Sequence, residues 1–496
     1  MMEEKEKPLK VPSVKKNFFI STLYEILCII TPFITAPYVS RVLGAEQIGV
    51  NSFVHSVQAY FCMFATLGTA AYGTREISRN RDNAYERSKL FWEIELLSIF
   101  TSGIAVIAWC IFIIFTVEYK IYYIILTLGI FDKMFAIGWF YSGTEQFKYT
   151  VTRNTIVKIT GIILVFTFVH TSDDLIIFIL INTLCNLFGA LSMWVPLKKF
   201  LVKVPVKELK IWRHLKETLV YFVPTIATSV YQVLDKTLIG LITHEESQNG
   251  FYEQANKIIN LIKIMSFGAI SGVVGSRISY LFTQNKIDEI KQRIRKSIDF
   301  VMLMGIGSCA GMYGIAKRFI PFFFGEGYDQ VISLLYILLP IVLIVGMNVI
   351  FVQLYYVPVG KRKQSSNYII MGAVFNLIAN ILLIPKWKAY GAAVGSIIAE
   401  VVILVFCFVH CNGFYSVKQL LLSMYKKLFA AMIMLVYLFI IDRVLTVQNW
   451  IVLVIQVIGG ALIYFVVLLI VKDRGLKILF EMKIFDRFRK KKRAES

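Results

Sequence analysis

Long apolar segments recur along the whole chain and constrain its fold more than any other feature. A helix needs about 20 consecutive, mostly apolar residues to cross the hydrocarbon layer of a bilayer. About fourteen segments meet this requirement, near residues 17–40, 47–72, 91–116, 121–141, 150–169, 174–196, 217–241, 250–275, 298–320, 330–357, 365–385, 390–411, 424–441 and 450–471. Because backbone groups that face lipid must be hydrogen-bonded within the protein, the sequence predicts an all-α polytopic membrane protein with about 14 transmembrane helices.

The overall composition excludes a water-soluble enzyme. Hydrophobic residues make up 57% of the 496-residue chain and charged residues 17%, whereas soluble domains contain about 45–50% apolar residues. The formal net charge is nevertheless +21. A charge of this size suggests nucleic acid, an anionic membrane surface or an anionic substrate.

The distribution of basic residues decides among these partners. If the N-terminus is cytoplasmic, and basic residues just inside span ends are counted with the connections, the cytoplasmic segments hold 41 of the 53 Lys and Arg residues and the external segments hold seven. Cytoplasmic connections are expected to hold such an excess. The sequence therefore predicts that both termini face the cytoplasm, that the positive charge meets anionic lipid headgroups, and that nucleic acid is not a partner.

A long basic connection divides the chain. We expect an N-terminal lobe over residues 1–196 (spans 1–6), a cytoplasmic basic connection over 197–216, a C-terminal lobe over 217–411 (spans 7–12), spans 13–14 over 412–471 and a basic amphipathic tail over 472–496. The first spans of both lobes start in the cytoplasm, so the two six-helix lobes would be parallel repeats. In 198–216 and in the tail, apolar residues recur every three or four positions and Lys or Arg fall on the other face, which predicts interfacial helices there.

Several kinds of chemistry lack a sequence signal. The chain has no G-x-x-x-x-G-K-[ST] loop for nucleotide phosphates. The five histidines show no metal-binding spacing, and no predicted external loop exceeds about 15 residues. We therefore predict a protein that is not an enzyme and uses no cofactor or metal.

Ionisable residues inside the predicted spans are the strongest functional signal, because such residues are costly in a bilayer and usually mark a transport route. They are Glu25, Asp132, Lys133, Lys158, Asp235, Lys236, Lys257, Lys263 and Glu400. Lys158 and Lys263 have no acid three or four residues away on their own helix, so each needs a partner on another helix or a water-filled cavity. Asp235 and Lys236 near a span end could be structural, and Glu253 and Lys257 could form a helical ion pair.

Span 8 is polar on several sides, which is typical of a helix that lines an aqueous cavity. Its polar residues are Tyr252, Gln254, Asn256, Asn260, Lys263 and Ser266. A cavity in which lysines outnumber acids favours anionic substrates, whereas a cation exporter would need acids to dominate.

Four groups of residues form a recognisable pattern by their order and spacing. They are 37–44 (PYVSRVLG) with Gly49; Gly68 with 72–78 (YGTREIS); 138–147 (GWFYSGTEQF) with Arg153, Asn154 and Lys158; and 324–328 (FGEGY) with Asn376, Asn380, 384–385 (IP), 391–393 (GAA) and Glu400. Over roughly residues 15–415, this pattern resembles the polysaccharide and oligosaccharide flippases of the multidrug/oligosaccharidyl-lipid/polysaccharide exporter superfamily, the O-antigen and capsule-repeat type. One departure is Lys388, where the family pattern suggests a turn glycine.

The resemblance implies two six-helix lobes around a central cavity that opens alternately to the two sides of the membrane. It implies a polyprenyl-diphosphate-linked oligosaccharide as substrate, membrane lipids as surroundings, a polysaccharide polymerase and glycosyltransferases as partners, and the cytoplasmic membrane of a bacterium as location. The cationic cavity residues would be Lys158, Lys263, Lys257, Arg41 and Lys236. Lys and Arg would replace water around the phosphates.

Two questions stay open at this point. The acids Glu25, Asp235, Glu400 and Asp132 could couple transport to an ion gradient, or each could only neutralise a lysine or hold a helix contact. A multidrug antiporter of the same fold, and a membrane-embedded polysaccharide polymerase or ligase, are the alternative functions.

Overall fold

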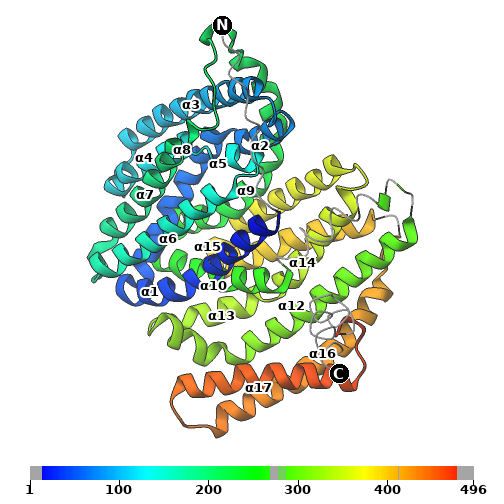
Figure 1. Ribbon diagram of the computed structural model, residues 1–496. Helices are drawn as coiled ribbons and strands as arrows, with labels where there is room; N and C mark the ends of the chain where they lie inside the picture. Colours follow the sequence, from blue (N-terminus) through cyan, green and yellow to red (C-terminus); the bar gives the residue numbers. More distant parts are fainter. Residues whose placement is uncertain are drawn as a thin grey trace, which may run out of the picture. The chain divides into compact units, whose positions relative to one another are not determined.

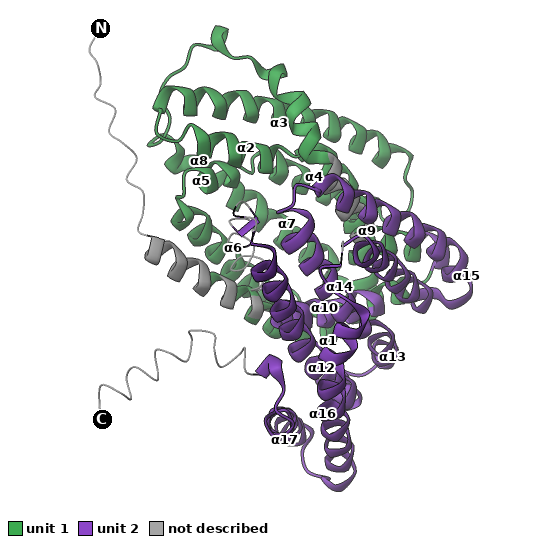
Figure 2. Cartoon of the chain, turned by 90° about the vertical axis from the view of Figure 1, so that its right-hand side faces the viewer, with its two compact units in different colours: residues 1–240, 245–250 green, residues 241–244, 251–496 purple. Residues whose placement is uncertain are grey.

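The computed structural model describes residues 14–267, 278, 281, 282, 284, 286–411 and 413–476, without the side chains of 14–23, 25, 26, 29 and 223–232. Every regular element in these ranges is a helix, as predicted (Figure 1). The chain divides into two compact units, which Figure 2 colours separately. Unit 1 contains residues 1–240 and 245–250, and unit 2 contains residues 241–244 and 251–496. The lobe boundaries given above stay a prediction.

Unit 1 is built from helices of very unequal length. They are α1 (Val14–Thr66), α2 (Thr69–Arg79), α3 (Ala84–Phe115), α4 (Lys120–Met134), α5 (Gly138–Gly143), α6 (Phe147–Phe168), η1 (Ser172–Asp174), α7 (Leu175–Ser192), α8 (Trp194–Leu197), η2 (Val206–Glu208), η3 (Ile211–His214) and most of α9 (Leu215–Thr243). A cluster of aromatic side chains forms its core around Phe91, Trp139, Phe140 and Tyr141, where α2, α3 and α5 meet.

Unit 2 contains most of α10 (Glu246–Phe267) and the later helices. These are α12 (Ile287–Phe324), α13 (Asp329–Leu338), α14 (Pro340–Phe351), the π-helical η4 (Val352–Tyr356), α15 (Arg362–Val409), α16 (Val417–Val444) and α17 (Asn449–Ile470). Its core runs along α12, which packs against α14, α16 and α17.

The predicted spans coincide with helices. Among the described residues, nine helical segments are long and apolar enough to cross a membrane, and they cover ten of the fourteen predicted spans because Arg362–Val409 contains two of them. The other four lie on α1, α9 and α10. These four are the first two spans of each predicted lobe.

Two of the long helices bend at residues with positive φ, each between two predicted spans. In α1 the bend is at Gly44 (φ 75°, ψ 171°), and in α15 it is at Lys388 (φ 50°, ψ −130°). Glycine adopts such backbone angles at little steric cost, whereas other residues are strained there. Where the resemblance suggests a turn glycine, the chain has Lys388, and this lysine adopts the positive φ.

The prediction of an interfacial helix over 198–216 is wrong. This connection contains two short 3₁₀ turns, η2 and η3, joined by extended residues. Side chains of α3 hold its backbone: Ser88 accepts from the amide of Val202 at 2.9 Å, and Glu93 accepts from the amide of Lys210 at 2.6 Å. Pro205 lacks an amide hydrogen and also disfavours a continuous helix. Most of the predicted tail helix, residues 477–496, lies outside the described residues.

Candidate functional site

The clearest charged cluster of unit 1 surrounds the buried carboxylate of Asp132 near the end of α4. Lys133 Nζ lies 2.6 Å from Asp132 Oδ2, and Arg153 Nη2 of α6 lies 3.8 Å from Asp132 Oδ1. Arg153 Nη1 also donates to Asn154 Oδ1 at 2.7 Å. Its Nε is buried and has no hydrogen-bond partner among the described groups.

Lys158 extends this cluster along α6. Its Nζ lies 5.9 Å from the ring centroid of Tyr24 on α1, a cation–π contact, and Tyr24 is also within electrostatic reach of Arg153. Lys158 is half-buried, and no ion pair of its side chain is found in the described part of the chain. Three cations thus accompany one carboxylate, so the cluster holds an excess of two positive charges. We name Asp132, Lys133, Arg153 and Lys158 the α4–α6 cluster.

The structure places the other cationic candidates of unit 1 on different elements. Arg41 is exposed on α1, before the bend at Gly44, and Lys236 is half-buried on α9 beside the buried Asp235. Thr237 next to them binds the second half of α1, with Ser56 Oγ at 2.9 Å and Tyr60 Oη at 3.2 Å. The side chain of Glu25 lies outside the described residues.

In unit 2 a buried polar group centres on Glu400 of α15. Asn348 Nδ2 of α14 donates to Glu400 Oε2 at 2.7 Å and to its backbone oxygen at 3.1 Å. Lys263 of α10 is half-buried and within electrostatic reach of Glu400. One helical turn before Glu400, Ser396 Oγ meets Tyr252 Oη of α10 at 3.0 Å. The predicted site residues Lys263 and Glu400 therefore lie in one group, and the half-buried Lys257 lies on the same helix as Lys263.

In unit 1, a second buried polar group joins the first half of α3 to the connection that precedes α9. Glu93 Oε2 lies 2.8 Å from His214 Nε2, and Arg213 pairs with the same carboxylate. Tyr72 Oη of α2 lies 2.7 Å from His214 Nδ1. Burial, which outweighs the nearby Glu93 carboxylate, lowers the pKa of His214. A neutral imidazole satisfies both contacts, since Nε2–H can donate to Glu93 and Nδ1 can accept from Tyr72.

Sequence reasoning did not single out Arg153, Asn348 or Glu93 of these groups, nor Glu95 near Glu93 on α3. Arg153 was noted only as part of a family motif, although a basic side chain near the end of a predicted span could have indicated a role in the site. Asn348 is neutral and sits in an apolar run, so it gives no charge signal. Glu93 and Glu95 lie just inside a span end, where acids are commonly solvated, yet the structure buries both. In the described part of the chain, no group of His, Cys, Asp or Glu residues has the geometry to hold a metal ion.

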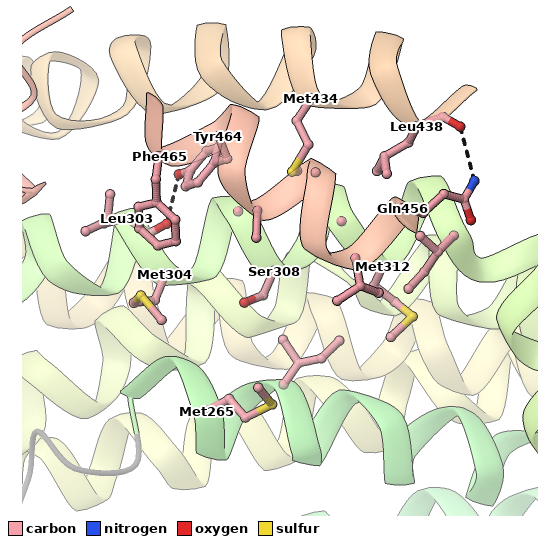
Figure 3. Close-up of a pocket in the computed structure, with 17 residues that line it drawn as sticks. Met265, Leu303, Met304, Ser308, Met312, Met434, Leu438, Gln456, Tyr464 and Phe465 are labelled. Atoms are coloured by element: carbon pink, nitrogen blue, oxygen red, sulfur yellow. Dashed lines mark hydrogen bonds between the residues drawn. The ribbon is translucent and has the colours of Figure 1, made fainter. Parts of the chain in front are cut away.

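An apolar cavity of about 320 Å³ lies in unit 2 between α10, α12, α16 and α17. Figure 3 shows four methionines at its walls, Met265, Met304, Met312 and Met434. Tyr464 and Gln456 at its edge donate hydrogen bonds to backbone oxygens. Tyr464 Oη donates to Leu303 O at 2.8 Å, and Gln456 Nε2 donates to Leu438 O at 3.1 Å. Flexible thioethers and few polar groups suit a hydrocarbon ligand.

Long apolar helices with charged groups among them define a multi-pass membrane protein. The profile of the family described as "Polysaccharide biosynthesis protein" matches residues 14–282, and the chain belongs to this family. A putative O-antigen transporter of Shigella dysenteriae is 24% identical over 402 residues, covering 79% of this chain and 98% of the relative.

Two solved structures have a similar fold. The lipid II flippase MurJ, in an inward closed conformation, matches with a TM-score of 0.70 and 15% identity over 91% of this chain and 98% of that chain. An inward-facing multidrug resistance transporter of the MATE family matches with a TM-score of 0.57 and 12% identity over 79% and 93% of the two chains. All three proteins are transporters or flippases by name, in agreement with the prediction that this chain is not an enzyme.

Proposed function

We propose that the chain is a flippase that moves a polyprenyl-diphosphate-linked oligosaccharide from the cytoplasmic to the outer leaflet of a bacterial cytoplasmic membrane. The observation that carries this proposal is the α4–α6 cluster, in which Lys133, Arg153 and Lys158 accompany the single carboxylate of Asp132. An excess of positive charge among the helices of a membrane protein marks a transport route and favours an anionic ligand.

A diphosphate is suited to this cluster. Arginine and lysine donate charge-assisted hydrogen bonds to phosphate oxygens, and these replace the water that the diphosphate loses when it enters the protein. Arg153 Nε has no hydrogen-bond partner in the described part of the chain, so it can donate to a ligand that reaches it. We assign the first contact with the diphosphate to Arg153 and Lys158, and further contacts along the transport route to Lys263, Lys257, Lys236 and Arg41.

The lipid tail requires a different environment, because it must stay in a hydrocarbon-like medium while the sugar crosses. The cavity between α12, α16 and α17 offers one, with walls of methionine, leucine and glycine. We propose that part of the polyprenyl chain occupies it. Transport would then proceed by alternating access of two six-helix lobes, residues 1–196 and 217–411, with both termini in the cytoplasm.

We also propose that transport is coupled to an ion gradient. Asp132 is already paired with two cations, and Glu400 accepts from Asn348 and lies within electrostatic reach of Lys263, so these two carboxylates can change partners when the lobes move. Asp235 and Glu25 are the other proposed coupling acids. Glycosyltransferases that build the substrate and a polymerase that consumes it are the proposed partners.

A deletion strain provides the test. If the proposal is right, the lipid-linked oligosaccharide accumulates on the cytoplasmic leaflet, and the chain restores its appearance at the outer leaflet. The multidrug antiporter stays the second candidate because a MATE transporter shares the fold. It would instead predict altered drug accumulation with normal surface polysaccharide.

A further inference from the structure

Two glutamates of α3, only two residues apart, are buried in opposite environments. Glu93 and Glu95 are 0% and 1% exposed. Glu93 receives hydrogen bonds or ion pairs from the amide of Lys210 and from the side chains of Arg213 and His214. This carboxylate is compensated, so it is stable in its charged form.

Glu95 lacks such compensation. Its Oε1 is buried without any hydrogen-bond partner among the described residues, and its polar neighbour is the indole of Trp139. An isolated carboxylate away from water is costly unless a cation or several donors compensate it. The neutral acid is the form that this environment accommodates, because it removes the charge and leaves one acceptor to the indole N–H.

No charged partner of Glu95 is found in the described part of the chain. The described titratable groups on the elements that pack against α3 are Tyr24, Cys28, Tyr38, Arg41, Glu46, His55, Tyr60 and Cys62 of α1, Tyr72, Arg75, Glu76 and Arg79 of α2, Lys120, Tyr122, Tyr123, Asp132 and Lys133 of α4, and Arg213 and His214 of η3. Within the described ranges, no hydrogen bond or ion pair joins any of these groups to the Glu95 carboxyl. The carboxyl therefore has no cation to pair with in this conformation.

Trp139 closes the site from the side of α5. Its ring stacks on Phe91, with ring centroids 5.6 Å apart, and lies so close to Gly73 of α2 that a Cβ there would come within 2.5 Å of the indole. The break between α4 and α5, at 135–137, ends two residues before Trp139.

We propose that Glu95 is a proton-binding site of the transport cycle, whose carboxyl holds a proton while Trp139 covers it and gives that proton to water when α5 moves away from α3. The O–H bond of the acid breaks, the carboxylate keeps the electron pair and water takes the proton, so no other reactant is needed. This role rests on the proposed transport function and adds to it the binding of one proton in each cycle.

The first experiment does not depend on transport. Infrared spectra of the purified full-length chain in lipid should contain a protonated carboxyl band at neutral pH that disappears in Glu95→Gln and persists in Glu86→Gln, a control in the first turn of the same helix. Glutamine is isosteric with the neutral acid, so Glu95→Gln should keep normal abundance and folding. A wild-type spectrum without such a band, or a band that survives Glu95→Gln, would overturn the proposal.

The second experiment measures the cycle, with the lipid-linked oligosaccharide extracted from the deletion strain as probe in proteoliposomes. An imposed proton gradient should change the wild-type rate about tenfold or more, whereas the Glu95→Gln rate should be independent of the gradient. If the band is lost but Glu95→Gln responds to the gradient like the wild type, Glu95 is a static buried acid and the proposal fails. If the wild type does not move this probe, the proposed flippase function fails, while the infrared result still decides whether Glu95 binds a proton.

Discussion

Glu93 Oε2 and His214 Nε2 lie 2.8 Å apart, and both side chains are almost fully buried. The contact ties the connection before α9 to the start of α3, where Arg213 and the amide of Lys210 bind the same carboxylate. Because α9 follows directly after His214, this group fixes the point at which the chain enters its seventh predicted span.

Acidification should weaken this group. The pKa of His214 is lowered in the folded protein, so the unfolded chain binds more protons between that lowered value and the ordinary pKa of about 6.5. The contribution of His214 to stability is therefore complete above about pH 6.5 and is lost as the pH falls through the lowered value. Thermal unfolding of the purified protein between pH 5 and 8 should show this loss. In His214→Gln the pH dependence should shrink, and in the exposed control His170→Gln it should stay; equal slopes in all three proteins would refute the assignment.

Removal of a cation from the α4–α6 cluster should reduce affinity for the diphosphate. A charge-assisted hydrogen bond to a phosphate contributes about 1.5–3 kcal/mol, or roughly ten- to 150-fold in affinity. Lys158→Ala should lose transport at normal membrane abundance, and Lys158→Arg should retain more activity than Lys158→Gln. Lys263→Ala in unit 2 should likewise lose transport at normal membrane abundance. The exposed Lys148→Ala at the start of α6 is the matched control, and full activity of Lys158→Gln would show that charge is not the role of this residue.

A larger side chain in the apolar cavity should block the lipid tail. Gly311 lines this cavity, and a Cβ at this position would meet nothing within 4 Å. A side chain at this position therefore starts in open space, and for Gly311→Leu we expect at least a tenfold loss of transport with little change in thermal stability. Gly161→Leu is the control, since Gly161 of α6 also has open space but lies outside the cavity. Equal transport by both variants would mean that the cavity takes no part.

Glycine at the bend of α15 should stabilise the protein. Lys388 has φ 50° and ψ −130°, a conformation that costs a residue with a side chain about 1–3 kcal/mol. Lys388→Gly removes this strain. Glycine also makes the unfolded chain more flexible, which lowers the stability by about 0.5–1 kcal/mol. The free energy of unfolding should therefore rise by about 1 kcal/mol. Lys386→Gly, at a helical position in the same helix, should instead destabilise the protein. A lower unfolding temperature for Lys388→Gly than for the wild type would contradict this account.

Much of the fold was predictable because each span must satisfy its own backbone hydrogen bonds. The length and apolarity of segments such as 91–116 and 450–471 predict helices, and α3 and α17 occupy them. The helix expected over 198–216 was wrong because its backbone binds Ser88 and Glu93 of α3. Such contacts are far apart in sequence, so local periodicity contains no sign of them.

The candidate site was predictable only as a set of charges. The positions of Lys158 and Asp132 inside apolar runs single them out, but the sequence does not say that Arg153 joins Asp132. Nor does it distinguish Glu93 from Glu95, which have the same chemistry on the same helix. Their difference arises from η3 and α5, which bring Arg213 and His214 to one carboxyl and Trp139 to the other.

The most direct test of the central claim is transbilayer movement of the substrate by the purified chain. Proteoliposomes would contain the lipid-linked oligosaccharide extracted from the deletion strain, and its accessibility at the outer surface would be followed with a membrane-impermeant sugar-oxidising reagent. The account predicts that the wild-type chain makes the inner pool accessible and that Lys158→Ala does so at least tenfold more slowly. An inner pool that stays protected in the presence of correctly folded wild-type protein would contradict it.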